Sequence, residues 1–565
     1  MKLLIDLYGE ASAKPAQERL NSMMEAFRLP EEAGSHSRGK RLSHADAFLI
    51  TYGDQVQDSG ITPLRCLSDF CRKHLKNIIT AVHVLPFYPY SSDDGFSVID
   101  YRKVDPMLGS WDDVAELGSN FRLMFDAVLN HISAQHEWFQ YFLKDVSKYR
   151  RYFTCVEGTP DLSKVVRPRT LPLLTEFRTS AGPKRVWTTF SDDQVDLNFS
   201  NPDVVLEILD VLLFYVSHGA DFLRLDAIAY LWKEIGTSCI HLPQTHAIIK
   251  LFRAVLDQLA PHALLITETN VPHDDNISYF GDGTDEAQMV YNFALPPLLL
   301  HTIRTGSSHA LTRWAASLKL PSDKTTFFNF LASHDGIGMN PVREILADSE
   351  IDAVVKQCLE HGGLVSYKRN PDGTDSPYEL NINYFDALSS PHSAENLDLQ
   401  VDRFIAAHTI LLSFTGVPAF YFHTLFGSRS WMDGPAKSGR NRTINREKPL
   451  LPVVEKELAA NASLRFKVFS RLRKLLEVRS QHPAFDPYGA QEVLEYEDSV
   501  FALVRSSAAP PERILYLQNI TSAYQAVVLS ESLEGIDLLN PSRRIHTNTV
   551  ELMPYEGLWL QLQTG

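Results

Sequence analysis

The chain has 565 residues, of which 44% are hydrophobic and 22% are charged, as is usual for a soluble globular protein. Its 54 basic and 69 acidic residues give a formal net charge of −15, which argues against nucleic acid or an anionic membrane as the main partner. Any anionic ligand must therefore be held by local basic side chains that act against the overall charge.

The cysteines and the N-terminal residues indicate where the protein works. The five cysteines are odd in number and contain no Cys-x-x-Cys pair, so neither a disulfide framework nor a structural zinc site is expected. The first residues, MKLLIDLYGEAS, include acidic side chains too early for a signal peptide, and no run of 18 apolar residues suggests a membrane span. We therefore predict a cytoplasmic protein that has no membrane partner.

The first 45 residues are predicted to form an N-terminal helical extension. Apolar residues recur at helical spacings through residues 1–30. The segment from Ser35 to Arg41 is polar, basic and contains glycine, so we expect a linker there.

From residue 47, short apolar runs alternate with longer amphipathic stretches. Eight runs are found, at 47–52, 81–87, 122–130, 221–227, 263–269, 289–295, 326–333 and 416–423. The periodicity alone does not exclude a doubly wound sheet. The number of runs, and the polar residues at their ends, favour an α/β fold of the (β/α)₈ TIM-barrel type over residues 46–487.

Two gaps in this rhythm are too long for simple crossovers. About 90 residues separate the third and fourth runs, and about 80 separate the seventh and eighth. We expect lid insertions after strands 3 and 7, at 132–205 (domain B) and 337–392 (domain B′). Residues 488–565 then change to short alternating patterns, which predict a C-terminal antiparallel β domain.

Charged side chains follow several of the predicted strands. Asp226 ends the fourth run, Glu268 the fifth, and Asp335 follows the seventh. The spacings of 42 residues (268 − 226) and 67 residues (335 − 268) match one and two strand–helix steps. Because active sites of such barrels lie at the carboxyl ends of the strands, the three carboxylates should meet at one mouth.

A pair of converging carboxylates suits retaining glycoside chemistry. Arg224 lies two residues before Asp226, hence on the same face of the strand, and its charge favours an ionised nucleophile at Asp226. Glu268 follows an apolar run, where desolvation would raise its pKa and favour an acid/base role. Asp335 can hold sugar hydroxyls and stabilise positive charge, while His131 and His334 can donate to hydroxyls.

Each of these residues also has a purely structural interpretation. A single carboxylate at a strand end is more often a helix cap, a lone histidine is more often part of the core, and an arginine near an aspartate is often a structural ion pair. The combination outweighs these alternatives, because four strand ends carry such groups in register with the barrel pattern.

Four segments carry a family resemblance. DAVLNH (126–131), RLDAIAYLWKE (224–234), ITET (266–269) and SHDGIG (333–338) resemble the four sequence regions of the α-amylase superfamily, glycoside hydrolase family 13. The similarity extends over residues 47–490. It implies the same roles for Asp226, Glu268 and Asp335.

Other segments resemble the sucrose phosphorylase subfamily of that family. They are HVLPFYPYSSDDGFSVIDY (83–101), VWTTFSDDQVDLN (186–198), KEIGTSC (233–239), FALPPLLLH (293–301) and NRTINRE (441–447). The resemblance implies these substrate-binding residues: Asp93, Phe96, His131, Gln194, Arg224, His334, Arg442, Arg169, Tyr230, Tyr378 and Glu379.

The subfamily also implies reversible phosphorolysis with inorganic phosphate as co-substrate. Its product is α-glucose 1-phosphate, and the reaction needs no cofactor and no metal, although Asn130 is a calcium ligand in many amylases. Arg167 and Arg169 on the first insertion, together with Arg442, would supply positive charge for phosphate. The expected partners are small molecules only, and the chain is expected to be a monomer or a homodimer.

The chain departs from sucrose phosphorylases at the leaving-group side. It has Asn270 where they have histidine, and Ser376-Pro-Tyr378-Glu379 where they have an aspartate and a glutamine. GFSVIDY, ITETNVPHDDN, FNFLASHDGIGMNP and the N-terminal extension resemble glucosylglycerate phosphorylases more closely. Lys437, Arg440 and Arg442 are candidates to hold the carboxylate of glycerate.

The predicted activity is therefore that of a glycosyltransferase-type phosphorylase that acts on 2-O-α-D-glucosylglycerate. A glucosylglycerol phosphorylase is the near alternative, with Glu379 accepting hydroxyl groups of glycerol. A sucrose or sucrose 6-phosphate phosphorylase, an α-glucosidase or transglucosidase, and a regulatory barrel without activity are the others.

Overall fold

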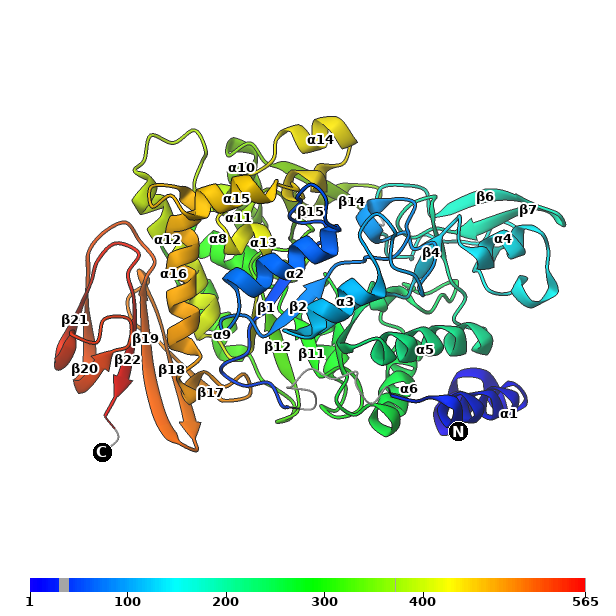
Figure 1. Cartoon of the computed structure of the whole chain (residues 1–565), viewed down its shortest axis with the longest axis horizontal. Coiled ribbons are helices and arrows are strands. Elements are labelled where there is room, and N and C mark those ends of the chain that lie inside the picture. Colours follow the sequence, from blue (N-terminus) through cyan, green and yellow to red (C-terminus); the bar gives the residue numbers. More distant parts are fainter. Residues whose placement is uncertain (30–39, 371, 564–565) are drawn as a thin grey trace.

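The computed structural model describes residues 1–29, 40–370 and 372–563 (Figure 1). Eight parallel strands close into a barrel in the order β1-β16-β12-β11-β10-β9-β3-β2. They are β1 (Phe48–Thr51), β2 (Ala81–Val84), β3 (Arg122–Val128), β9 (Ala220–Asp226), β10 (Leu264–Thr267), β11 (Met289–Tyr291), β12 (Thr326–Asn329) and β16 (Val417–Tyr421). Each strand coincides with one predicted run, so the predicted (β/α)₈ barrel is confirmed.

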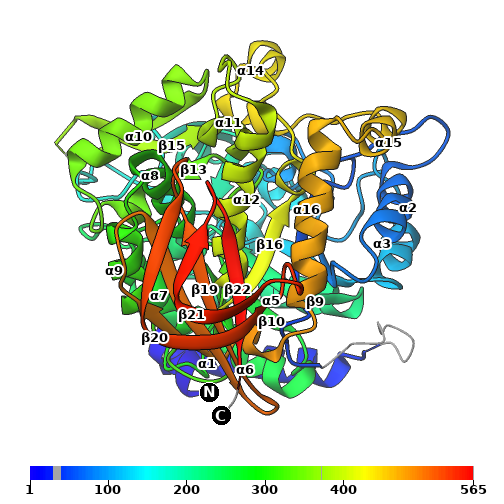
Figure 2. The same cartoon turned by 90° about the vertical axis from the view of Figure 1, so that its left-hand side faces the viewer.

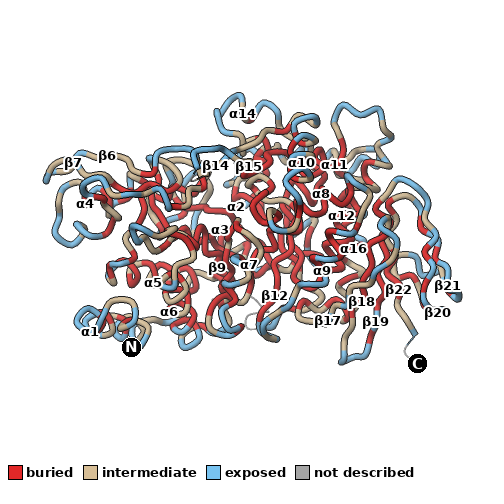
Figure 3. Tube along the Cα trace, turned by 180° about the vertical axis from the view of Figure 1, so that it is seen from behind, coloured by how far each residue is buried: buried red, intermediate tan, exposed pale blue. Residues whose placement is uncertain are grey.

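Side chains fill the interior of the barrel. Phe48 of β1 lies between Phe222 of β9 and Phe328 of β12, with ring centroids 4.8 and 5.1 Å apart. Strands that are buried on both faces require nearly continuous apolar sequence, which is why the runs show little alternation. The buried residues accordingly concentrate in the middle of the molecule (Figure 3).

Helices form the outer layer of the barrel. The main ones are α2 (Pro63–His74), α3 (Trp111–Gly118), α5 (Pro202–Ser217), α6 (Pro243–Leu259), α8 (Leu295–Thr305), α9 (His309–Ser317), α12 (Leu397–Ser413) and α16 (Leu464–Arg479). Local sequence sets their ends. At the start of α5, Pro202 occupies the first turn, and the side chain of Asn201 accepts a hydrogen bond from the backbone N–H of Asp203.

Both long gaps contain additional structure. The first, between β3 and α5, holds β4 (His131–Ser133), α4 (Glu137–Leu143), β5 (Cys155–Val156), β6 (Leu174–Thr179), β7 (Gly182–Trp187) and β8 (Gln194–Asp196). The second, between β12 and α12, holds β13 (Ile337–Gly338), α10 (Asp348–Glu360), β14 (Leu364–Arg369), β15 (Asp375–Asn381) and α11 (Tyr384–Leu388). The numerical limits of the domains stay predictions.

A six-stranded antiparallel sheet forms the C-terminal part (Figure 2). Its strands are β17 (Ala490–Leu494), β18 (Val500–Ala508), β19 (Pro511–Asn519), β20 (Gln525–Asp537), β21 (Arg544–Leu552) and β22 (Gly557–Leu562). The predicted antiparallel domain is confirmed. The sequence analysis did not identify β21, because most of its residues are exposed and polar.

The predicted N-terminal helix is present as α1 (Lys2–Ala26), beside α5 and α6 in Figure 1. Its backbone leaves the helical conformation at Gly9, where φ is 72°. The Tyr8 hydroxyl donates to the carbonyl of Phe199 at 3.0 Å. Of the predicted linker, residues 35–39 lie outside the described residues.

All five cysteines are free thiols in the structure. In the described parts of the chain, no helix combines the length and apolar character needed to cross a bilayer.

A buried guanidinium ties several segments of the barrel together. Arg479 of α16 is 1% exposed, and within the described part of the chain its side chain donates to backbone carbonyls alone. The acceptors are the carbonyl groups of His44, Asp46, Leu412, Gly416 and Phe485. The approach to β1, the turn before β16 and the end of α16 thus share one donor.

We expect Arg479→Ala to lower the free energy of unfolding by about 3 kcal/mol, because several buried carbonyls lose their donor at once. Urea denaturation measures this. Arg473→Ala on the same helix is the control, because that side chain is half exposed and, among the described residues, pairs with Glu477 alone. An equal loss in both variants would contradict the assigned role of Arg479.

Candidate active site

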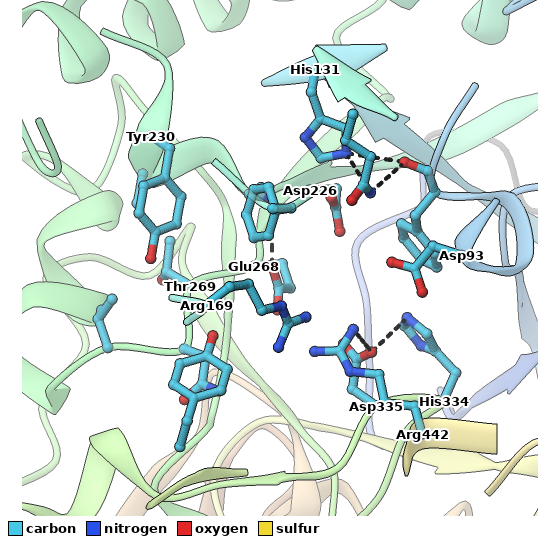
Figure 4. Close-up of a pocket in the computed structure, with 18 residues that line it drawn as sticks. Asp93, His131, Arg169, Asp226, Tyr230, Glu268, Thr269, His334, Asp335 and Arg442 are labelled. Carbon is cyan, nitrogen blue, oxygen red and sulfur yellow. Dashed lines mark hydrogen bonds and ion pairs between the residues drawn. The ribbon is translucent and has the colours of Figure 1, made fainter. Parts of the chain in front are cut away.

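A pocket opens at the carboxyl ends of the barrel strands (Figure 4). It is lined by Asp93, Phe96, His131, Arg169, Phe190, Gln194, Asp226, Ala227, Ala229, Tyr230, Glu268, Thr269, Asn270, Val271, His334, Asp335, Tyr378 and Arg442. The predicted catalytic and glucose-binding residues are all in this set except Arg224, which contacts Asp226. Of the other predicted residues, Arg169, Tyr230 and Tyr378 line the pocket, whereas Glu379 contacts Arg442, and Arg167, Lys437 and Arg440 do not line the pocket.

Arg224 organises the carboxylates on the β3 and β9 side. Its Nη1 donates to Oδ1 of Asp226 at 2.8 Å and also to Asp126 of β3. Asp126 in turn lies 2.6 Å from Nε2 of His83. Nη2 of Arg224 is 3.8 Å from Glu268, which directly follows β10. One buried cation therefore faces three carboxylates.

Burial and mutual repulsion act on the two central carboxyl groups. Burial raises the pKa of Asp226 well above its ordinary range, Arg224 opposes this, and Glu268 adds to the rise. Burial likewise raises the pKa of Glu268, against Arg224 and with Asp335. The expectation for Glu268 agrees with this direction. The expectation for Asp226 considered Arg224 alone and omitted burial, which is the larger influence.

Asp335 is in a different electrostatic environment. Its Oδ1 lies 2.6 Å from Arg442, 3.4 Å from Arg446 and 3.5 Å from Nε2 of His334. Burial would raise the pKa of Asp335, but its neighbours, above all the guanidinium of Arg442, outweigh burial and hold the pKa well below the usual range. Asp335 is therefore a permanent anion in the pocket wall.

Asp93 reaches the pocket from a strained turn after β2. Asp93 and Asp94 both have positive φ, 55° and 49°, which non-glycine residues rarely adopt. Gly95 follows with φ of 108°, and a Cβ there would lie 2.5 Å from the carbonyl oxygen of Pro86. An arginine from a distant part of the chain contacts both aspartates and holds the turn in this conformation.

That arginine is Arg446, which the sequence analysis missed. It is 2% exposed as a side chain, and its Nη1 lies 2.5 Å from Asp94 and 3.6 Å from Asp93. Its Nε donates to the carbonyl of His334 at 2.9 Å. The segment NRTINRE contains two Asn-Arg pairs, and the sequence analysis assigned a role only to the first, Arg442.

Phe96 and His334 form a flat wall. Their rings stack with centroids 4.8 Å apart and an interplanar angle of 3°. The carbonyl of Phe96 accepts from Nε2 of Gln194 at 3.1 Å and lies 3.0 Å from Nε2 of His131. The first insertion, which carries Gln194, is thereby joined to the barrel at the pocket.

The two insertions supply the outer wall of the pocket. The Arg169 guanidinium lies 5.7 Å from the ring centroid of Tyr378, so the two insertions meet there. Tyr230 packs edge-on against Phe190, with centroids 5.6 Å apart.

Three other predicted cations do not line this pocket. Arg167 donates to the carbonyl of Leu171 in its own loop. Lys437 pairs with Asp433 at the surface. Arg440 stands at the rim, 3.7 Å from Asp93, with half of its side chain exposed.

Glu379 of β15 lies beneath Arg442. Its two carboxylate oxygens accept from Nε and Nη2 of Arg442 at 3.0 and 2.7 Å, and the residue is 1% exposed. Both oxygens are thus occupied by Arg442, and the carboxylate does not face the pocket.

The ammonium group of Lys233 neutralises the buried carboxylate of Asp196 and also contacts Asn130. Nζ of Lys233 lies 2.8 Å from Asp196 and donates to Oδ1 of Asn130 at 2.6 Å. Asn130, the position that many amylases use for calcium, is therefore bonded to an internal cation. Among the described residues, no cluster of His, Cys, Asp and Glu side chains has the arrangement of a metal site.

The sequence analysis gave no role to Phe190, Thr269 or Val271, which also line the pocket. Thr269 and Val271 flank Asn270 directly after Glu268, so their proximity to a catalytic candidate was the available signal. Phe190 lies on the first insertion, where periodicity gives no information on side-chain direction.

Comparisons with known proteins agree with this geometry. Residues 73–336 match the α-amylase catalytic domain model. A glucosylglycerate phosphorylase of Spirochaeta thermophila is 48% identical over 99% of this chain and 97% of its own length. One of Allomeiothermus silvanus is 49% identical over 98% of this chain and 96% of its own.

This chain belongs to the α-amylase family, in the branch of these phosphorylases. The resemblance found in the sequence is thereby confirmed. A crystal structure of a sucrose 6F-phosphate phosphorylase from Thermoanaerobacter thermosaccharolyticum has the same fold, with a TM-score of 0.74 and 24% identity over 88% of this chain and 97% of that one.

We expect Arg446→Gln to lower kcat/KM for the donor at least about a hundredfold, because the strained Asp93 turn and Asp335 lose a shared cation. Steady-state kinetics with glucose 1-phosphate measures this. Arg440→Gln removes a half-exposed cation near the same aspartate and should cost less than about fivefold. Equal losses would show that Arg446 does not position the turn.

Proposed function

We propose that the protein is a retaining glucosylglycerate phosphorylase. In this proposal it converts 2-O-α-D-glucosylglycerate and inorganic phosphate reversibly into α-D-glucose 1-phosphate and D-glycerate. The observation that carries the proposal is the placement of Asp226, Glu268 and Asp335 in one pocket, in a chain nearly half identical over its length to two glucosylglycerate phosphorylases. Phosphate is the co-substrate, and both ligands are small molecules.

In the first step, Asp226 attacks the anomeric carbon of the glucosyl group. The bond from that carbon to the oxygen of glycerate breaks, and Glu268 gives its proton to that oxygen. The positive charge that develops on the sugar ring is stabilised by the anionic Asp335, which Arg442 and Arg446 keep ionised. The product is a β-glucosyl ester of Asp226 and free glycerate.

In the second step, a phosphate oxygen attacks the same carbon from the opposite face. The ester bond breaks, Asp226 becomes a carboxylate again, and the proton of hydrogen phosphate passes to Glu268. Two inversions give net retention. Arg169 is placed to receive phosphate, because it lines the pocket and forms no ion pair with a described residue.

The reaction requires the proton of the Asp226–Glu268 pair to reside on Glu268. Arg224 favours this, since it donates to Asp226 at 2.8 Å but is 3.8 Å from Glu268. A direct charge-assisted hydrogen bond stabilises a carboxylate more than the longer contact does. Repulsion between the two groups then keeps the proton on the glutamic acid.

Asp226→Asn and Glu268→Gln should each lower kcat by about 10³-fold or more, because one loses the nucleophile and the other the acid. α-Glucosyl fluoride, whose leaving group needs no proton, should restore much of the activity of Glu268→Gln and none of that of Asp226→Asn. Near-normal turnover of either variant with glucose 1-phosphate would contradict the role assigned to the substituted residue.

The raised pKa of Glu268 sets a pH dependence. The acid must hold its proton to release glycerate, so kcat/KM should fall as the pH rises through this pKa. With α-glucosyl fluoride, Glu268→Gln should lack this alkaline fall. A fall that persists unchanged in the variant would assign the titration to another group.

The activity itself is tested by supplying glucose 1-phosphate with D-glycerate, glycerol, fructose, fructose 6-phosphate or water alone. We expect phosphate release with D-glycerate far above the rate with water. Preference for glycerol or fructose would assign the chain to a neighbouring specificity. Equal release in water alone would indicate a hydrolase on the same scaffold.

A further inference from the structure

Strand β15 of the second insertion packs directly against the segment that follows Asp335. β15 pairs with β13 so that Gly338 faces Glu379 and Ile337 faces Leu380. A Cβ on Gly336 would lie 2.5 Å from Cγ of Glu379 and 2.6 Å from the carbonyl oxygen of Leu380. The glycine directly after Asp335 thus makes room for the buried carboxylate of Glu379.

The arginines around the pocket differ in how many carboxylates they contact. Arg224 has Asp126, Asp226 and Glu268 as partners. Arg446 has Asp93, Asp94 and Asp335. Arg442 lies between two carboxylates, Asp335 at 2.6 Å and Glu379 at 2.7 Å.

Among the pocket-lining residues that the structure describes, Arg169 is the one guanidinium without a carboxylate partner. Its contact is the ring of Tyr378, the neighbour of Glu379. An incoming anion therefore meets the uncompensated guanidinium of Arg169. The second guanidinium of the pocket, that of Arg442, is already more than neutralised by its two carboxylate partners.

We propose that Glu379 is a specificity-determining residue that sets the affinity of this pocket for anions. Glu379 orients Arg442 through a bidentate pair and, together with Asp335, more than cancels its charge, so that Arg169 is the guanidinium left to hold an anionic ligand. This inference rests on the proposed function, in which glycerate and phosphate, both anions, occupy the pocket in turn.

The physical reason is that an anionic ligand must leave as well as bind. Without the charge of Glu379, Arg442 would keep only Asp335 as a carboxylate partner, and beside Arg169 it would hold phosphate or glycerate more tightly and slow the release of that anion. The carboxylate of Glu379 reduces that attraction without entering the pocket, since its position is fixed by Arg442 and by the β13–β15 pairing. A neutral ligand would not respond to it.

The test is Glu379→Gln, which keeps the size and one acceptor oxygen but removes the charge. Isothermal titration calorimetry with inorganic phosphate should give a Kd about tenfold lower than that of the wild type, because a nearby negative charge is lost. The Kd for D-glucose, a neutral probe of the same pocket, should stay within about twofold. In turnover, kcat should fall together with KM for phosphate, as expected when the anionic products leave the pocket more slowly.

Asp375→Asn is the matched control. Asp375 lies at the exposed end of the same strand and pairs with Arg369 at 2.6 Å, so its loss changes the net charge equally but outside the pocket. We expect no change in either Kd. A phosphate Kd that also falls in this variant would assign the effect to the overall charge and overturn the inference.

Two further outcomes would overturn it. An unchanged phosphate Kd in Glu379→Gln would show that the charge does not act on the pocket. Equal changes for phosphate and glucose would show that the variant only disturbs the lid. A wild type that shows neither phosphate binding nor phosphate-dependent turnover would instead remove the proposed function, and that result is read before any variant is compared.

Discussion

Carboxylates are crowded at the mouth of this barrel, and buried guanidinium groups placed between them make the crowding possible. Asp226, Glu268, Asp335 and Asp93 share one pocket, where like charges would otherwise repel strongly at low dielectric. Arg224 lies under the first two, and Arg446 joins the turn of Asp93 to Asp335. The catalytic geometry, the strained turn and the protonation states all depend on this alternation of charge.

The lids are part of the same electrostatic arrangement. The first carries Gln194, which donates to the carbonyl beside the Phe96 ring, and Arg169, the cation free to meet an anion. The second brings Tyr378 to Arg169 and Glu379 to Arg442. Because each insertion contributes groups that contact barrel residues, the wall of the pocket is built from three separate parts of the sequence.

Much of this could be predicted from the sequence, since the periodic runs carry the strands and the carboxylates fall at their ends. Arg446 repeats the Asn-Arg pattern of Arg442, and only the fold shows that both arginines reach the site. The orientation of Glu379, inward to Arg442 rather than toward the ligand, depends on the pairing of β13 with β15, which no periodicity encodes. The effect of burial on Asp226 likewise required the packed pocket.

The central claim is a glucosyl ester of Asp226 that phosphate and glycerate reach in turn. Exchange of radiolabelled phosphate into glucose 1-phosphate, in the absence of any acceptor, tests it most directly. The account predicts exchange by the wild type and none by Asp226→Asn. If the wild type exchanges no label, or exchange requires glycerate, the two-step mechanism at Asp226 is contradicted.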